Sequence, residues 1–276
     1  AQLHRGSTMF VRLLSGSGMI LAAAFIADQA IAHDEGHAVK ELIPTGKLRV
    51  GIALAPAPTT LFVTQDASGT PHGVTVDLGN ELARKLGVAV EFFAAPNTGE
   101  LTEATSSGKI DVTFMPVDEA RKTKVDFGPA YYVLESTYLV RGNSEIKTLV
   151  DVDREGVRAV GIANTTTVRS AERSLKNIKI VSAQTIDEAM DMMRTEKADA
   201  LALSRDALAI LSAKLPGSRI LDGGFQSTGI AIAVPKNRTA ALAYVSAFME
   251  SAKASGIVRR AFDAVGLKNE PVVPAQ

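Results

Sequence analysis

The chain has 276 residues, of which 46% are hydrophobic and 22% are charged, so it can bury one large core or two moderate ones. Its 30 basic and 30 acidic residues balance, and this neutral sum gives no indication of a nucleic-acid or anionic-membrane partner. There is no cysteine, which excludes disulfides, thiolate nucleophiles, cysteine-based metal sites and a lipid-bearing cysteine.

The first expected element is a secretory signal peptide that begins at Met9, after a few preceding residues. Arg12 gives its positive start, Leu13–Ile26 gives the apolar stretch, and Ala30-Ile31-Ala32 is a small-x-small cleavage site. A transmembrane anchor is the alternative, but the apolar stretch is short against the about 20 residues that span a bilayer. We therefore assign residues 1–32 to export, and we expect a soluble periplasmic product.

Residues 33–45 are expected to form a flexible N-terminal tail. His33 and His37 lie there beside two acidic residues, but a polar terminal segment fixes no coordination geometry. We expect no metal site and no cofactor.

From Gly46 onward, strand patterns alternate with helix patterns, and this order is typical of a parallel α/β sheet. Thr75 is expected to cap a helix that ends at Gly87. The remaining early elements are expected at Lys47–Ala53 and Val88–Phe93 (strands) and Glu100–Ser107 (a short helix).

The segment Ile110–Tyr132 carries the clearest chemical signal. Apolar residues alternate with Asp111 and Thr113, which predicts a strand with one buried face that Pro116 interrupts. Asp118 can then cap a short helix, and Arg121 falls in its first turn beside free N–H groups. A guanidinium at that position can bind a carboxylate or a phosphate, or it can be one more solvated basic side chain.

A second lobe is expected after Arg141, since the chain again alternates between strands and helices. Met190, Met192 and Met193 are expected to fill its core, behind a capping box at Thr185 and Glu188. Its other elements are expected at Arg158–Ala163 (strand), Thr165–Leu175 (helix), Asp199–Leu203 (strand) and a helix from Ser204. Ile230–Val234 is expected to cross back to the first lobe, where Thr239–Ser251 and Ile257–Val265 form the last two helices.

Two segments resemble motifs of the family-3 periplasmic solute-binding proteins. Asp111, Arg121, Val125-Asp126-Phe127, Pro129 and Tyr131 follow the order of the family segment that ends in V-D-F-S-x-P-Y. Gly73–Leu78, followed by Glu81-Leu82-Ala83 and Leu86-Gly87, resembles the family signature G-F-D-V-D-L-x-x-x-L-A-x-x-L-G. The resemblance extends from about Gly46 to Gly266.

The resemblance implies an α/β fold with two periplasmic-binding-protein-like lobes, each a mainly parallel sheet flanked by helices, joined by two crossing strands. The expected limits are 46–138 with 230–268 for the first lobe, 139–229 for the second, and 269–276 for a C-terminal tail. A hinge is expected at Tyr138–Val140 and Ile230–Ala233. The implied function is delivery of a small polar or carboxylate-bearing solute to the membrane subunits of an ABC importer by a monomeric protein.

The expected ligand site lies where strands end and helices begin, in the cleft between the lobes. By resemblance, Arg121 and a Thr near Thr166 hold the ligand carboxylate. The full expected set is Thr60, Thr98, Pro116, Val117, Arg121, Thr165, Thr166, Thr167 and Ser204. Phe62 is expected to be core rather than a contact, and Pro116 stands where the family usually has a hydroxyl.

An enzyme of this fold, a dehydratase resembling cyclohexadienyl dehydratase, is the alternative. It would need a general acid in the cleft, for which Asp118 and Glu119 are the candidates. No phosphate loop, dinucleotide fingerprint or nucleophile elbow is present in the sequence.

The ligand is expected to lack a free α-amine. Amino-acid binders of the family usually hold the ammonium with an Asp at a position that is Ser204 here. A hydroxyl cannot neutralise an ammonium, and Asp206 is expected to turn away into the following helix.

Overall fold

The structure is a computed structural model that describes residues 35–54 and 59–276. The expected signal peptide and its cleavage site fall within residues 1–34, outside the described residues, and so does His33. Within the described ranges, no helix is both long and apolar enough to cross a membrane.

Residues 35–42 form a helix, contrary to the flexible tail expected over 33–45. Ala38 and Leu42 are buried, and Leu42 is part of the core of the first lobe. Glu41 connects this helix to the start of the helix Thr239–Ala254, because its carboxylate accepts a hydrogen bond from the Ala241 N–H at 2.7 Å. Two buried apolar side chains and a polar contact were enough to order a segment that reads as polar.

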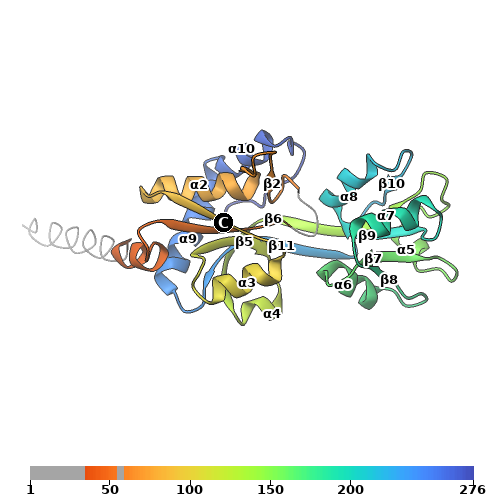
Figure 1. The fold of residues 1–276 in the computed structure, drawn as a ribbon, viewed down its shortest axis with the longest axis horizontal. Coiled ribbons are helices and arrows are strands. Elements are labelled where there is room, and N and C mark those ends of the chain that lie inside the picture. The colour runs from red at the N-terminus through yellow and green to blue at the C-terminus, as the bar shows by residue number, and fades with distance from the viewer. Residues whose placement is uncertain (1–34, 55–58) are drawn as a thin grey trace, which may run out of the picture.

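Two groups of elements lie at the two ends of a long ribbon made by β6 (Val125–Val140) and β11 (Gln226–Pro235), as Figure 1 shows. The first lobe contains β1 (Leu48–Ala53), β2 (Thr64–Gln65), β3 (Pro71–His72), α2 (Val74–Leu86), β4 (Val90–Ala95), α3 (Thr98–Ser106), β5 (Val112–Pro116), α4 (Glu119–Lys122), α9 (Thr239–Ala254) and α10 (Ile257–Ala264). The second lobe contains α5 (Leu149–Val152), β7 (Ala159–Ile162), α6 (Thr166–Ser174), β8 (Val181–Ala183), α7 (Ile186–Arg194), β9 (Ala200–Ser204), α8 (Arg205–Ser212) and β10 (Arg219–Ile220).

Apart from β2 and β3, which pair only with each other, the strands of both lobes join one sheet in the order β4-β1-β5-β11-β6-β9-β7-β8, with β10 beside β6. Pairing is parallel within each lobe, between β1 and its neighbours β4 and β5, and between β7 and its neighbours β8 and β9. The ribbon strands pair antiparallel with each other and with β5 and β9. The two-lobed α/β fold expected from the sequence is therefore confirmed.

The segments expected to form the hinge lie inside three-stranded regions of this sheet. Tyr138–Val140 pair with β9 in the second lobe, and Ile230–Ala233 pair with β5 in the first. Between them, Val133–Glu135 pair with Ser227–Gly229, and no third strand of the described sheet lies beside that part of β6. The two-stranded part of the ribbon is the most weakly braced connection between the lobes.

Strand β5 is buried on both faces, not on one as its alternating pattern suggested. Asp111 and Thr113 are fully buried together with their apolar neighbours Val112 and Phe114. Both faces of this central strand are covered by helices, which is usual for a parallel sheet. Asp111 is tolerated there because Arg49 neutralises it through three hydrogen bonds of 2.7–3.0 Å.

Several local expectations about helix ends can be compared with the structure. Asp118 caps α4 as expected, and Gly87 ends α2 in a left-handed conformation (φ 69°) that suits glycine. Thr75 does not cap α2: it lies inside the helix and its hydroxyl donates to the Phe62 carbonyl at 2.7 Å. The carboxylate of Glu188 accepts from the Gln184 N–H, so Thr185 caps α7 without the reciprocal half of a capping box.

The methionines of α7 pack as expected. Met190 and Met193 are buried in the core of the second lobe, and Met192 packs against it from a partly buried position. They fill core space and do not line the cleft described below.

Candidate ligand-binding site

A cleft of about 750 Å³ lies between the two lobes. Its walls are the segments that follow the carboxyl ends of β4, β5, β7, β8 and β9, where helices α3, α4, α6, α7 and α8 begin. In Figure 1, α6 and α8 stand at the end of the second lobe that is nearer the first. Ligand groups in this cleft would meet helix N-termini and strand-end side chains from both lobes.

Arg121 lies on the first-lobe wall, in a fixed orientation. Its Nη1 donates to the Pro116 carbonyl at 2.9 Å, and its Nη2 donates to Thr98 Oγ1 at 2.7 Å. Burial lowers the pKa of the half-buried guanidinium, Asp118 opposes that shift, and the cation of Arg169 adds to it. These contacts use two of the five N–H donors, so the fork retains donors for an anion.

The three threonines at the start of α6 have three different roles. The hydroxyl of Thr165 caps the helix by accepting from the Val168 N–H at 3.1 Å. The hydroxyl of Thr167 is buried and bonds to Ser136 on β6 at 3.0 Å. Thr166 lines the cleft, and its hydroxyl has no hydrogen bond to any other described residue. Thr166 is therefore the threonine with a hydroxyl available to a ligand.

Asn164 sets the direction from which α6 enters the cleft. It is in the left-handed region (φ 63°), which Asn adopts more readily than most residues. The turn it makes places Thr165–Thr167 directly after β7 and leaves the first N–H groups of the helix on the cleft wall.

Ser204 and Asp206 form the end of β9 and the start of α8. Ser204 lines the cleft at the N-cap position, but its side chain makes no capping bond. Asp206 also lines the cleft, contrary to the expectation that it turns away. Its Oδ2 accepts from Thr59 of the first lobe at 3.0 Å, and its buried Oδ1 has no hydrogen-bond partner among the described residues.

Of the residues expected at the site, the structure brings seven to the cleft and leaves two outside. Those on the cleft are Thr98, Pro116, Arg121, Thr165, Thr166, Thr167 and Ser204. Val117 instead bonds through its N–H to the Gly229 carbonyl of β11 at 2.8 Å. Thr60 bonds through its carbonyl to the N–H of Val74, and its neighbour Thr59 takes the place on the cleft.

Other cleft residues were not expected from the sequence. Phe62 lines the cleft while it also packs against the first-lobe core, so it is not core alone. Arg169 reaches the cleft from α6, Gln184 follows the end of β8, and Asp187 lies in the first turn of α7. The signal for Arg169 was its spacing of three from Thr166, which puts both on one helix face.

Asp118 and Glu119, the two acids expected for a dehydratase, are not among the residues that line the cleft. Oδ1 of Asp118 accepts from the N–H groups of Ala120 and Arg121, and exposed Glu119 pairs with Lys122 at 2.6 Å. The described residues also contain no group of three or more acidic or histidine side chains that could hold a metal ion.

Comparison with known proteins agrees with this geometry. The model of the bacterial extracellular solute-binding proteins, family 3, matches residues 48–264. The chain belongs to this family. It is 28% identical over 211 residues to the probable histidine-binding protein of Campylobacter jejuni, covering 74% of this chain and 78% of that one. It is 25% identical over 191 residues to a glutamine-binding protein of Geobacillus stearothermophilus, covering 65% and 69%.

A solved structure of the same fold is that of the ancestral amino acid-binding protein AncCDT-1, described as a precursor of cyclohexadienyl dehydratase. Its TM-score is 0.68 at 27% identity, with 82% of this chain and 98% of that chain covered. Because the family and these relatives are binding proteins, the family-3 chain described here is a binding protein rather than an enzyme.

Proposed function

We propose that this family-3 protein binds an α-amino acid in the cleft and delivers it to the membrane subunits of an ABC importer. The relatives named for histidine and glutamine support an amino-acid ligand. A relative in Bacillus subtilis named as the glutamine-binding protein of an ABC transporter supports the importer as partner. The protein would act as a periplasmic monomer, exported by the N-terminal segment over residues 1–32.

The observation that carries the proposal is the buried, unpartnered Oδ1 of Asp206. A carboxylate oxygen taken out of water is costly unless a donor or a cation satisfies it. An α-ammonium offers both the charge and three N–H donors. The expectation of a ligand without an amine depended on Asp206 leaving the cleft, and that premise is wrong.

Groups from both lobes provide for the other end of an amino acid. The donors that Arg121 retains, with the hydroxyl of Thr166 and the first N–H groups of α6, would hold the α-carboxylate. An amino acid would thus bridge a cation of the first lobe and an anion of the second.

Closure around the ligand would bend the two-stranded part of the ribbon. We place the hinge at Val133–Glu135 and Ser227–Gly229, between the regions where a third strand braces β6 or β11. The lobe limits of 46–138 with 230–268 and 139–229 remain predictions, and a hinge at this place would assign residues 136–138, which pair with β9, to the second lobe.

The test is a thermal-shift screen of the twenty amino acids beside their deaminated acids, followed by calorimetry on wild type and Asp206→Asn. We expect at least one amino acid to stabilise the protein, and we expect its deaminated acid not to do so. Asp206→Asn should weaken binding of that amino acid by about ten- to a hundredfold, since a charge-assisted bond is lost. Stabilisation by the deaminated acids alone would contradict the proposal.

A further inference from the structure

A second arginine lies on the cleft wall, and the binding scheme above does not use it. Arg169 is exposed on α6 of the second lobe, and its side chain makes no hydrogen bond or ion pair with any described residue. It faces the same cavity as Arg121 of the first lobe. The electrostatic influence of Arg169 on Arg121, which lowers the pKa of Arg121, indicates that the two guanidinium groups lie within range of each other.

Helix geometry directs Arg169 toward the carboxylate end of the cleft. Arg169 and Thr166 are three residues apart and so lie on one face of α6. Side chains on a helix lean toward its N-terminus, which favours a guanidinium of Arg169 over the first turn, where the N–H groups of Thr166 and Thr167 have no partner within the helix. That first turn is the part of the second lobe that would meet a carboxylate held by Arg121.

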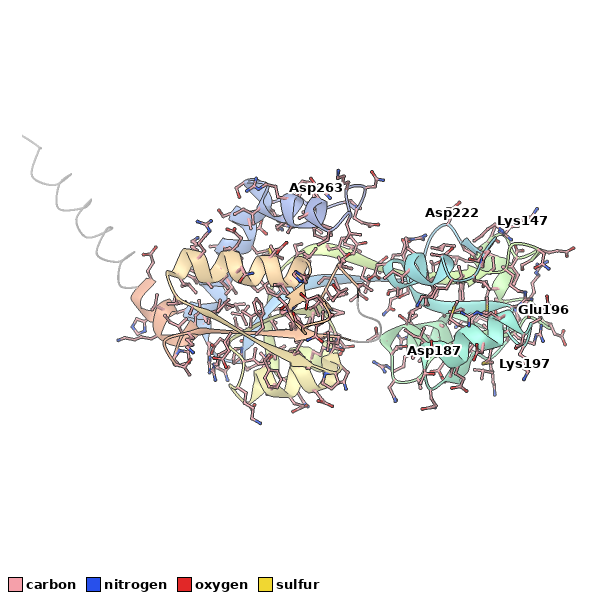
Figure 2. All side chains as sticks on the ribbon, turned by 45° about the horizontal axis from the view of Figure 1, so that its top comes forward. Lys147, Asp187, Glu196, Lys197, Asp222 and Asp263 are labelled. Atoms are coloured by element: carbon pink, nitrogen blue, oxygen red, sulfur yellow. The ribbon has the colours of Figure 1, made fainter. Side chains whose placement is uncertain are left out.

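The acidic side chains of the cleft do not neutralise Arg169. Asp206, which follows β9, accepts a hydrogen bond from Thr59 of the first lobe. Asp187 is exposed in the first turn of α7, beyond the end of β8. No ion pair joins Arg169 to either acid among the described residues. Figure 2 labels Asp187 on the part of the second lobe nearer the first, while Glu196, Lys197 and Lys147 lie toward its far end.

We propose that Arg169 is the second-lobe half of a two-arginine clamp for the ligand carboxylate, with Arg121 as the first-lobe half. This inference rests on the proposed function. Two cations on opposite lobes repel each other when the lobes approach, so they oppose closure of the free protein. A carboxylate between them turns this repulsion into two attractions, and it therefore favours the closed state over the open one.

The binding test compares Arg169→Gln with Arg173→Gln. Arg173 is an exposed arginine on the same helix that does not line the cleft, so it controls for the loss of a charge from α6. The probe is whichever amino acid stabilises the wild-type protein most in the screen above. We expect Arg169→Gln to weaken its binding about tenfold, and less at high salt, while Arg173→Gln stays within about twofold. Equal affinities of the two variants would overturn the clamp.

A second measurement needs no ligand and keeps the two proposals separable. The chain contains no cysteine, so spin labels can be attached at Lys109→Cys in the first lobe and Lys214→Cys in the second. We expect the distance distribution of the free protein to shift to shorter values in Arg169→Gln but not in Arg173→Gln. If no amino acid binds the wild type, the proposed function fails, and the distances alone decide the inference. A shift specific to Arg169→Gln then supports repulsion across the cleft, and unchanged distances overturn it.

Discussion

The two lobes begin their central strands with the same anchor. In the first lobe, Asp111 accepts from the backbone N–H, Nε and Nη2 of Arg49 at 2.9, 3.0 and 2.7 Å. In the second, Asp199 accepts from the same three groups of Arg158 at 2.8, 3.0 and 2.8 Å. Each acid is followed by a strand that runs toward the cleft, β5 in one lobe and β9 in the other.

At the cleft ends of these two strands the lobes differ in charge. Strand β5 leads to Arg121, a cation, whereas β9 leads to Asp206, an anion. The two anchors have the same geometry and start both strands in the same way, so the contrast between the lobes lies in the charge at the strand ends. Similar lobes with opposite strand-end charges suit a ligand that carries both charges.

The anchors also differ in burial, so we expect them to contribute different amounts to the free energy of unfolding. The side chain of Asp111 is 0% exposed and that of Arg49 is 21% exposed. The corresponding values are 17% for Asp199 and 55% for Arg158. Solvent screens the second pair more strongly than the first.

The largest effect is expected for Asp111→Ala. It leaves Arg49, and Arg238 at 3.7 Å from the carboxylate, without their buried anion. The free energy of unfolding should fall by about 3 kcal/mol, in the range measured for broken buried ion pairs. Chemical denaturation checks it, with Asp199→Ala as the matched variant, for which about 1 kcal/mol is expected. If the two variants lose the same free energy of unfolding, the difference in burial does not make one anchor stronger than the other.

The next effect concerns binding at the cationic strand end. Arg121→Lys keeps the charge but loses the planar fork that Thr98 and Pro116 orient, so the amino-acid affinity should fall about ten- to a hundredfold. Calorimetry measures it. Arg84→Lys, on the exposed face of α2, serves as control and should bind like wild type. If Arg121→Lys binds the amino acid with wild-type affinity, Arg121 does not form the carboxylate site.

The stability that the second anchor, Asp199 with Arg158, contributes should depend on pH. The hydrogen bonds from Arg158 lower the pKa of Asp199 from 3.8 to about 2. The stabilisation from Asp199 is therefore fully present above about pH 4 and is lost as the pH falls through 2. In urea titrations, wild type should lose about 1 kcal/mol more stability than Asp199→Asn between pH 5 and pH 2.5, after allowance for solvent screening. Parallel losses in both proteins would show that Asp199 does not contribute.

The smallest effect is expected across the cleft. Thr59→Val removes the hydrogen bond to Asp206 and should lower the amino-acid affinity about threefold, within the usual range for one neutral donor. Thr60→Val is the control, since its side chain is off the cleft wall. If the two variants bind equally well, Thr59 does not help to orient Asp206.

The fold could be predicted from the sequence because its helices and strands carry clear hydrophobic periods. Most of the expected limits were off by one to three residues, while β11 begins at Gln226, four residues before the expected Ile230. Strand β8 was missed because it is short and exposes Val181, so it lacks a buried pattern. The rule about strand ends found Arg121 and Ser204 but not Asp206, because the first turn of α8 returns its carboxylate to the cleft. The sequence did not show that Thr59, and not Thr60, lines the cleft. Both residues lie outside helices and strands, so no hydrophobic period predicts which side chain faces the cleft.

The most direct test of opposite charges on the two lobes is calorimetry with three matched probes on the wild-type protein. These are the amino acid that stabilises the protein most, its carboxamide, which lacks the carboxylate, and its deaminated acid, which lacks the ammonium. The account predicts tight binding of the amino acid, and at least tenfold weaker binding of each analogue, because each leaves one buried charge unpaired. A deaminated acid that binds as tightly as the amino acid would contradict it.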